Sequence, residues 1–172
     1  AEFGIIIDVT LRLRDIPEAS FPHLFYFDDD ASAFKAIEDF MSNKFSPAVS
    51  PNVIRFLDGN HLHDTNEIVH ANIFKETAAV LIEFGSEEDN RIFLDYLART
   101  GKREKAPRYA ATYLWNERLF GMKTKRLGPT ILASEVIMPV SKAAEFIGKA
   151  KKLGQHFGVE ICVDAYLLDA AR

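Results

Sequence analysis

The sequence predicts an α+β domain, in which a sheet of antiparallel or mixed strands carries helices on one face. Strand-like apolar runs and amphipathic helical segments follow one another without the regular alternation of strand and helix that a parallel sheet requires. Several connections between the predicted elements are short. Apolar residues make up 48% of the 172 residues, and 14 phenylalanines can supply much of a core, which argues against a disordered chain.

The first predicted strand, residues 5–14, stands apart from the others. Its apolar residues alternate with polar ones, which is typical of a half-buried strand. Pro17 and Pro22 follow and separate it from the rest of the chain. We therefore predict that residues 1–16 are the last strand of a neighbouring domain that the chain lacks, and that residues 17–172 form the domain proper.

Periodicity, caps and breakers predict the remaining elements. Further strands are predicted over residues 24–27, 53–57, 77–84, 130–137 and 159–163. Helices are predicted to begin near Asp30 as an N-cap, at a capping-box-like pair formed by Ser86 and Asp89, with Pro107 in a first turn, and after Ser141 as a cap. The polar residues 61–74 carry only a weak helical stripe. From residue 24 onward the order is similar to ferredoxin-like split βαβ units.

Charge and cysteine content narrow the possible functions. The net charge of −4 argues against a general nucleic-acid surface. No apolar run is long enough to span a bilayer, and the start of the chain has no secretory signal pattern. Cys162 is the only cysteine, so an intrachain disulfide is impossible and a cytoplasmic setting fits best. We predict that Cys162 is a small core residue on the last strand.

The sequence has no self-contained nucleotide motif, because Gly-x-Gly-x-x-Gly, Walker and Gly-x-Ser-x-Gly patterns are all missing. A His-x-His pair can bind a transition metal if a turn directs both imidazoles the same way, yet no third ligand stands at a diagnostic spacing. We therefore predict a solvated polar segment and no metal site. The metal-capable side chains of this segment are Asp58, His61, His63, Asp64 and His70.

Trp115 and Arg118 are the most suggestive pair in the chain. Trp115 is the sole tryptophan, and Arg118 follows one helical turn later. A guanidinium held near an indole by this spacing can grip a carboxylate, and the alternative is a core tryptophan beside a solvated arginine. A basic turn follows, which is either a solvated rim or a surface for an anionic substrate or partner: Lys123, Lys125 and Arg126.

Three stretches together carry a resemblance to a known family. They are residues 3–13 (Phe-Gly-Ile-Ile-Ile-Asp-Val-Thr-Leu-Arg-Leu), residues 114–118 (Leu-Trp-Asn-Glu-Arg) and residues 135–140 (Glu-Val-Ile-Met-Pro-Val). The first resembles the Gly-Ile-Ile-Thr-Glu-x-Thr-Leu-x-Leu strand that closes the FAD-binding domain in FAD-linked oxidases of the vanillyl-alcohol oxidase superfamily. The others resemble the Leu-Trp-x-x-Arg element and the Asp-x-x-x-Pro strand in the C-terminal domain of the glycolate oxidase flavoprotein subunit and D-lactate dehydrogenase group.

The resemblance implies the cap, or substrate, domain of an FAD-dependent dehydrogenase or oxidase of 2-hydroxy acids such as glycolate or D-lactate. FAD would be bound mainly by a domain or subunit that is absent from this chain, so the chain alone is expected to be inactive and to hold no catalytic residue. Arg118 is implied to bind the substrate carboxylate, with Trp115 and Lys125 beside it. The backbone implied to touch FAD belongs to Gly4, Ile5 and Ile6.

Some positions depart from the family pattern. Ala133 stands where related dehydrogenases have a lysine, and Glu135 replaces the aspartate. The family's Gly-His-x-Gly-Asp-Gly-Asn-x-x-His segment does not follow Val163, so neither a metal nor a catalytic histidine is assigned. The alternative hypothesis is a non-catalytic ferredoxin-like binding or dimerisation module, in which open strand edges such as residues 5–13 pair two copies into a homodimer.

Overall fold

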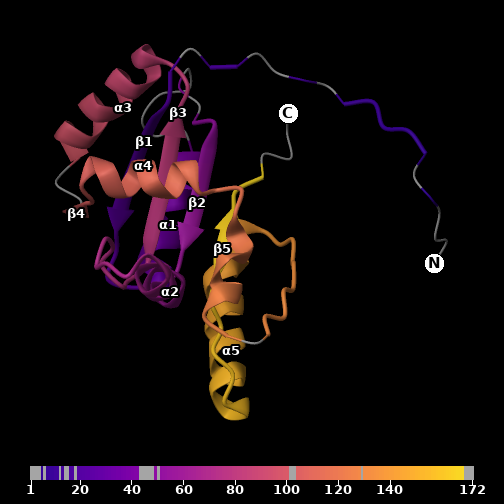
Figure 1. Cartoon of the computed structure of the whole chain (residues 1–172). Helices are drawn as coiled ribbons and strands as arrows, with labels where there is room; N and C mark the ends of the chain where they lie inside the picture. The colour runs from indigo at the N-terminus through magenta and orange to yellow at the C-terminus, as the bar shows by residue number, and fades with distance from the viewer. Residues whose placement is uncertain are drawn as a thin grey trace.

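The structure, a computed structural model, describes residues 5, 7–11, 13, 16, 17, 19–42, 49, 51–100, 104–128 and 130–168. In that part of the chain, five strands form one antiparallel sheet in the order β4-β1-β3-β2-β5 (Figure 1). In chain order the elements are β1 (Phe21–Tyr26), α1 (Asp30–Met41), β2 (Val53–Leu57), α2 (Gly59–Val69), β3 (Ala79–Phe84), α3 (Glu87–Thr100), β4 (Glu104–Lys105), α4 (Arg108–Asn116), the 3-10 helix η1 (Gly121–Arg126), α5 (Val140–Phe157) and β5 (Asp164–Tyr166).

The topology contains two interlocked split βαβ units. β1 and β2, joined through α1, flank β3 and are both antiparallel to it. β3 and β4, joined through α3, flank β1 in the same way. β5 extends the sheet along the free edge of β2. The predicted α+β class and its ferredoxin-like arrangement are therefore confirmed.

Helices cover both faces of the sheet rather than one, which corrects a detail of the prediction. Alternate strand residues point to opposite sides, so neighbours such as Leu24 and Phe25 belong to different apolar clusters. One cluster includes residues of α1, α3 and α5. The other includes residues of α2 and α4, and α4 crosses the strands in Figure 1. Helix α2 lies in the β2–β3 connection and α4 follows β4. Neither helix belongs to the two split βαβ units, whose own helices are α1 and α3.

Helix boundaries follow local capping chemistry to within a residue or two. α1 is capped by Asp29 rather than by Asp30, because Asp29 Oδ1 accepts from the Ser32 N–H at 2.7 Å. The predicted cap of α3 is confirmed by a 3.1 Å bond from the Asp89 N–H to the Ser86 hydroxyl oxygen. Pro107 is the N-cap of α4 rather than its first helical residue. Helix α5 begins before the predicted cap, at Val140, and ends at Phe157, followed by Gly158 as its C-cap with a left-handed φ of 66°.

The predicted strand over residues 5–14 is not formed by the residues that the structure describes there. They have no regular secondary structure, and Ile5 is 92% exposed. In Figure 1 this segment runs away from the sheet. Alternation of apolar and polar residues shows how a strand would be oriented, but a strand also needs a neighbour that supplies hydrogen bonds, and here the described residues pair with none.

Two predicted strands near the end of the chain are wrong. The described residues of 130–137 form no strand, and Leu132 is 92% exposed. The last strand is β5 rather than residues 159–163, and Cys162, predicted as a core residue, is exposed. The pairing of β5 with β2 begins only at Asp164, because Asp58 fixes the position of the preceding residue, Val163. The Asp58 N–H donates to the Val163 carbonyl at 3.1 Å, and Leu57 then lies opposite Asp164.

Two glycines of α5 should respond in opposite ways to alanine. A Cβ on Gly148 would meet nothing within 4 Å, so Gly148→Ala should raise the free energy of unfolding by about 0.5–1 kcal/mol through helix propensity. A Cβ on Gly154 would lie 2.6 Å from the Val159 carbonyl oxygen, so Gly154→Ala should lower it by about 1–3 kcal/mol. Urea unfolding of both variants measures the difference, and equal shifts would contradict the close approach.

Candidate functional site

Trp115 and Arg118 lie together at the end of α4. The helix ends at Asn116, so Arg118 sits just past it, and the guanidinium carbon lies 3.8 Å from the centre of the Trp115 ring. Arg118 Nη1 also donates to the Trp115 carbonyl oxygen at 2.7 Å. Both side chains are half-buried. The pair is therefore neither a core tryptophan nor a freely solvated arginine, because each side chain fixes the other.

Arg118 retains most of its capacity to bind an anion. A guanidinium has five N–H donors in a planar fork, and one of them, on Nη1, donates to the Trp115 carbonyl oxygen. Among the residues that the structure describes, no carboxylate forms an ion pair with Arg118. The full positive charge is held in place by stacking and remains available. A carboxylate could pair with it in bidentate geometry.

The basic turn after Arg118 forms η1, and its charges differ in how far they are neutralised. Lys123 forms an ion pair with Glu117 and lies 5.3 Å from the Phe120 ring centre. Lys125 is exposed, and no ion pair joins it to another described residue. Lys125, which the resemblance places beside Arg118, therefore lies on the adjoining turn. In the described part of the chain, no contact links its side chain to the Arg118 guanidinium. Glu135 is likewise exposed, and no ion pair ties it to this turn in the described part of the chain.

Of the three residues implied to touch FAD, the structure describes only Ile5. Gly4 and Ile6 lie outside the described residues. Ile5 lies on the exposed segment that precedes the sheet. A small cavity lies beneath η1, with a volume of about 30 Å³, roughly the space of one water molecule. A 2-hydroxy acid does not fit inside it, so the surface of Arg118 is the accessible part of the site.

A buried arginine that the sequence analysis missed lines this cavity. Arg55 of β2 is 3% exposed and binds Asp164 of β5 through two hydrogen bonds, Nε to Oδ1 and Nη2 to Oδ2, both 2.7 Å long. Its guanidinium also lies over the Tyr166 ring, 5.1 Å from the centre. A charged residue inside the apolar run of residues 53–57 is the signal that could have marked it, because buried arginines are almost always paired.

A second buried charge network joins three helices. Asp58 is fully buried and caps α2, since its Oδ1 accepts from the N–H groups of His61 at 2.9 Å and Val163 at 3.0 Å. Its other oxygen lies 2.9 Å from Lys151 Nζ of α5, which also binds Asp30 of α1 at 2.8 Å. Burial by itself would lower the pKa of Lys151, but the hydrogen bonds and charges of the two aspartates outweigh it and raise the pKa.

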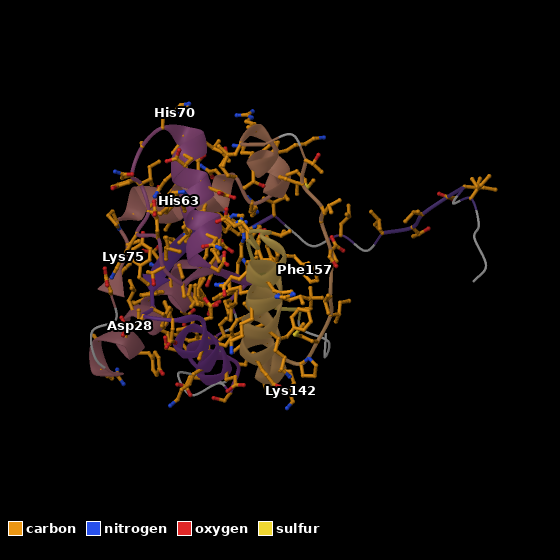
Figure 2. The ribbon with its side chains drawn as sticks, turned by 90° about the horizontal axis from the view of Figure 1, so that it is seen from below. Asp28, His63, His70, Lys75, Lys142 and Phe157 are labelled. Atoms are coloured by element: carbon orange, nitrogen blue, oxygen red, sulfur yellow. The ribbon has the colours of Figure 1, made fainter. Side chains whose placement is uncertain are left out.

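The metal-capable residues predicted from sequence do not converge. Asp58 is a helix cap, and the His63 ring bonds Glu76 at 3.0 Å. His70 ends α2 with a left-handed φ of 53°, and Figure 2 shows it well separated from His63. Only Asp64 of this set joins a group of ligand atoms within the described residues.

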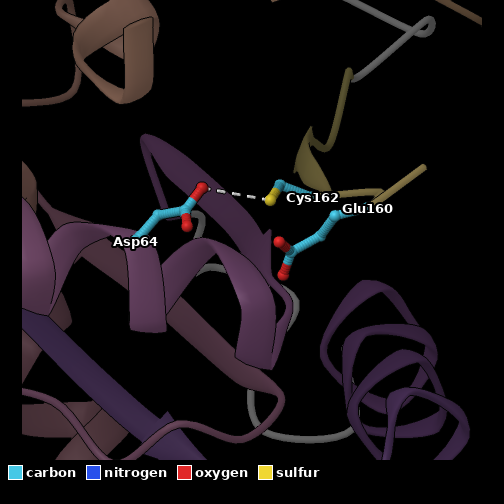
Figure 3. Close-up of side chains that lie close together, drawn as sticks. All are labelled: Asp64, Glu160 and Cys162. Carbon is cyan, nitrogen blue, oxygen red and sulfur yellow. Dashed lines mark hydrogen bonds between the residues drawn. The ribbon is translucent and has the colours of Figure 1, made fainter. Parts of the chain in front are cut away.

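That group consists of Asp64, Glu160 and Cys162, whose candidate ligand atoms lie within 4.8 Å of one another (Figure 3). The Cys162 thiol donates to Asp64 Oδ2 at 3.2 Å. Desolvation of the sulfur by neighbouring atoms, followed by the hydrogen bond and charge of Asp64, raises the pKa of the Cys162 thiol, although the residue as a whole is exposed. A raised pKa disfavours the thiolate, which is the form of cysteine that binds metals.

Two buried histidines should make the domain less stable in acid. Burial is the main cause that lowers the pKa of both His23 and His61 below 6.5. The unfolded chain therefore binds more protons below about pH 6.5, and the free energy of unfolding should fall as the pH drops from 7 to 5. His61→Gln should make this fall smaller, as measured by urea unfolding at several pH values.

His63 provides the opposite control. The hydrogen bond and charge of Glu76 raise the pKa of His63, so its contribution is present below about pH 6.5 and is lost as the pH rises through the folded-state pKa. His63→Gln should therefore make the fall in stability between pH 7 and pH 5 steeper. If both variants changed the slope in the same direction, the assignment of these two opposing shifts would be wrong.

Fold and site together define a ferredoxin-like α+β domain that presents, beside a basic turn, a stacked arginine without an ion-pair partner among the described residues. The family described as FAD linked oxidases, C-terminal domain, matches residues 16–171, and the chain belongs to this family. Comparison with curated proteins gives no match. No helix in the described part of the chain is long and apolar enough to cross a membrane. Family membership confirms the resemblance at this level and indicates an oxidoreductase that uses FAD as part of a larger protein.

Proposed function

We propose that this domain is the substrate-binding cap of an FAD-dependent dehydrogenase or oxidase of 2-hydroxy acids such as glycolate or D-lactate. The proposal rests on Arg118, whose guanidinium is stacked on Trp115 and is not neutralised by a described carboxylate. Membership of the family indicates an oxidoreductase. The available charge of Arg118 is the reason to propose an acid as its substrate.

A 2-hydroxy acid carries its carboxylate next to the carbon that is oxidised. A bidentate pair with Arg118 would therefore fix the position of that carbon as well as the charge, because the guanidinium fork and the carboxylate are both planar. Trp115 keeps the fork from rotating, and the exposed Lys125 adds positive potential that attracts the anion. These residues bind and orient the acid.

We do not assign the flavin to the described residues of this chain. Ile5 is exposed, and the cavity beneath η1 holds about one water molecule. In this proposal FAD belongs to a partner domain or subunit, and residues of this chain carry no step of the redox chemistry. We propose further that residues 1–16 belong to the FAD-binding unit and residues 17–172 to the cap, because the described residues before Pro17 lie outside the sheet.

The exposed apolar residues around η1 support the binding of a partner domain or subunit at this site. Their side chains are exposed on the turn that follows Arg118, where a partner would bury them and lower the local dielectric around the bound acid. They are Leu119, Phe120, Met122 and Leu127.

The binding step can be tested on the chain itself, because Trp115 is its only tryptophan and lies against the proposed ligand-binding group. D-lactate and glycolate should change the Trp115 emission saturably, with a dissociation constant on the order of millimolar for a single charged anchor. The carboxylate-free analogue 1,2-propanediol should have no effect, and acetate should show what the hydroxyl group adds. Emission that stays flat with both acids would reject this proposal and favour a non-catalytic binding module.

A further inference from the structure

A contact between β5 and the segment after α4 reaches Arg118 from the far end of the chain. The Tyr166 hydroxyl donates to the Arg118 carbonyl oxygen at 3.0 Å, across 48 residues of sequence. This carbonyl lies just past the end of α4, where backbone acceptors lack helical partners. The Arg118 N–H is only weakly held, at 3.4 Å from the Trp115 carbonyl. The tyrosine therefore supplies the long-range restraint on this residue's backbone.

Tyr166 is itself fixed by the buried pair of Arg55 and Asp164. Asp164 and Tyr166 are two residues apart on β5, so their side chains lie on the same face of the strand. Arg55 lies opposite Tyr166 in the sheet, stacks on its ring and holds Asp164 by two hydrogen bonds. The ring is thus placed by the strand pairing and by the guanidinium above it, while its hydroxyl points to Arg118.

We propose that Tyr166 is a positioning residue for Arg118, and that the Arg55–Asp164 pair holds it in that role. The inference rests on the proposed function, in which Arg118 binds the substrate carboxylate. By fixing the Arg118 backbone, the tyrosine keeps the guanidinium on the Trp115 ring before an acid arrives. Arg55 is buried and paired with Asp164, so it takes no part in binding the acid directly.

The first measurement needs no ligand. Trp115 emission of the free chain reports the stacked guanidinium, so Arg118→Gln defines the spectrum without it. Tyr166→Phe removes one oxygen and keeps the ring beneath Arg55, and it should move the emission toward that of Arg118→Gln. Tyr109→Phe, the same change at an exposed tyrosine of α4, should leave it unchanged. Spectra are taken well below the unfolding temperature, so a mere loss of global stability does not move them.

The second measurement is the titration with D-lactate. Loss of a neutral hydrogen bond that orders the binding group should weaken affinity about fivefold in Tyr166→Phe and leave Tyr109→Phe unchanged. Unchanged free-chain emission in Tyr166→Phe would overturn the positioning role, whether or not any acid binds. Changed emission in Tyr166→Phe together with no response of the wild type to any acid would support the positioning of Arg118 and reject the proposed function, so the two failures are distinct.

Discussion

Arg118→Gln should weaken the binding of D-lactate and glycolate by about one to two orders of magnitude, the effect of losing charge-assisted hydrogen bonds to the ligand. The variant keeps a side chain of similar polarity but removes both the charge and the planar fork. In the flavoenzyme that contains this domain, kcat/KM for the acid should fall by a similar factor. Titration of Trp115 emission and steady-state kinetics measure the two effects.

Three further variants separate charge from geometry. Arg118→Lys keeps the charge but loses the fork and the stacking, so it should still weaken binding about tenfold. Lys125→Gln removes an exposed charge and should have a small effect that disappears at high salt. Arg91→Gln, on the exposed surface of α3, is the matched control and should bind the acid like the wild type. Unaltered affinity in Arg118→Gln would remove this residue from the site.

Lys151→Met should lower the free energy of unfolding by about 3–5 kcal/mol, because it leaves the fully buried carboxylate of Asp58 without its cation. Two aspartates would then face each other across a gap that the lysine had filled. Lys149→Met is the matched control on the same helix. Its ion pair with Glu145 is exposed on both sides, and such pairs contribute about 0–1 kcal/mol. Denaturant unfolding of the two variants gives the comparison.

A double variant tests whether charge is the cause. Asp58→Asn keeps an oxygen that can accept from His61 and Val163 but carries no charge. Combined with Lys151→Met, it should recover part of the lost stability. If the double variant were as unstable as the sum of the single ones, the network would act through packing rather than through the charge on Asp58.

Sequence was sufficient where structure depends on neighbours along the chain. The strand at residues 53–57 has its predicted bounds, and the cap of α3 lies at Ser86 as its hydroxyl chemistry requires. The proximity of Trp115 and Arg118 could be predicted because one helical turn separates them in the sequence. Their proximity follows from this spacing alone, whereas the proposed restraint by Tyr166 does not.

Sequence was insufficient where a partner strand decides the outcome. The alternating residues 5–14 and the apolar residues 130–137 have strand-like patterns, but the described residues of neither segment meet a neighbour to pair with. The contacts of Tyr166 and Asp164 could not be predicted for the same reason, because they follow from the register of β5 against β2. No local pattern in the chain encodes a pairing between positions so far apart.

The position of β5 has a consequence for synthesis of the domain. Arg55 and Asp164 are separated by 109 residues, and Tyr166 reaches back to Arg118 over 48. A ribosome releases β1, α1 and β2 long before the strand that completes the sheet edge. Closing so large a loop is slow relative to local helix formation. The sheet core can therefore assemble during translation, while the arginine gains its final restraint only after β5 has left the exit tunnel.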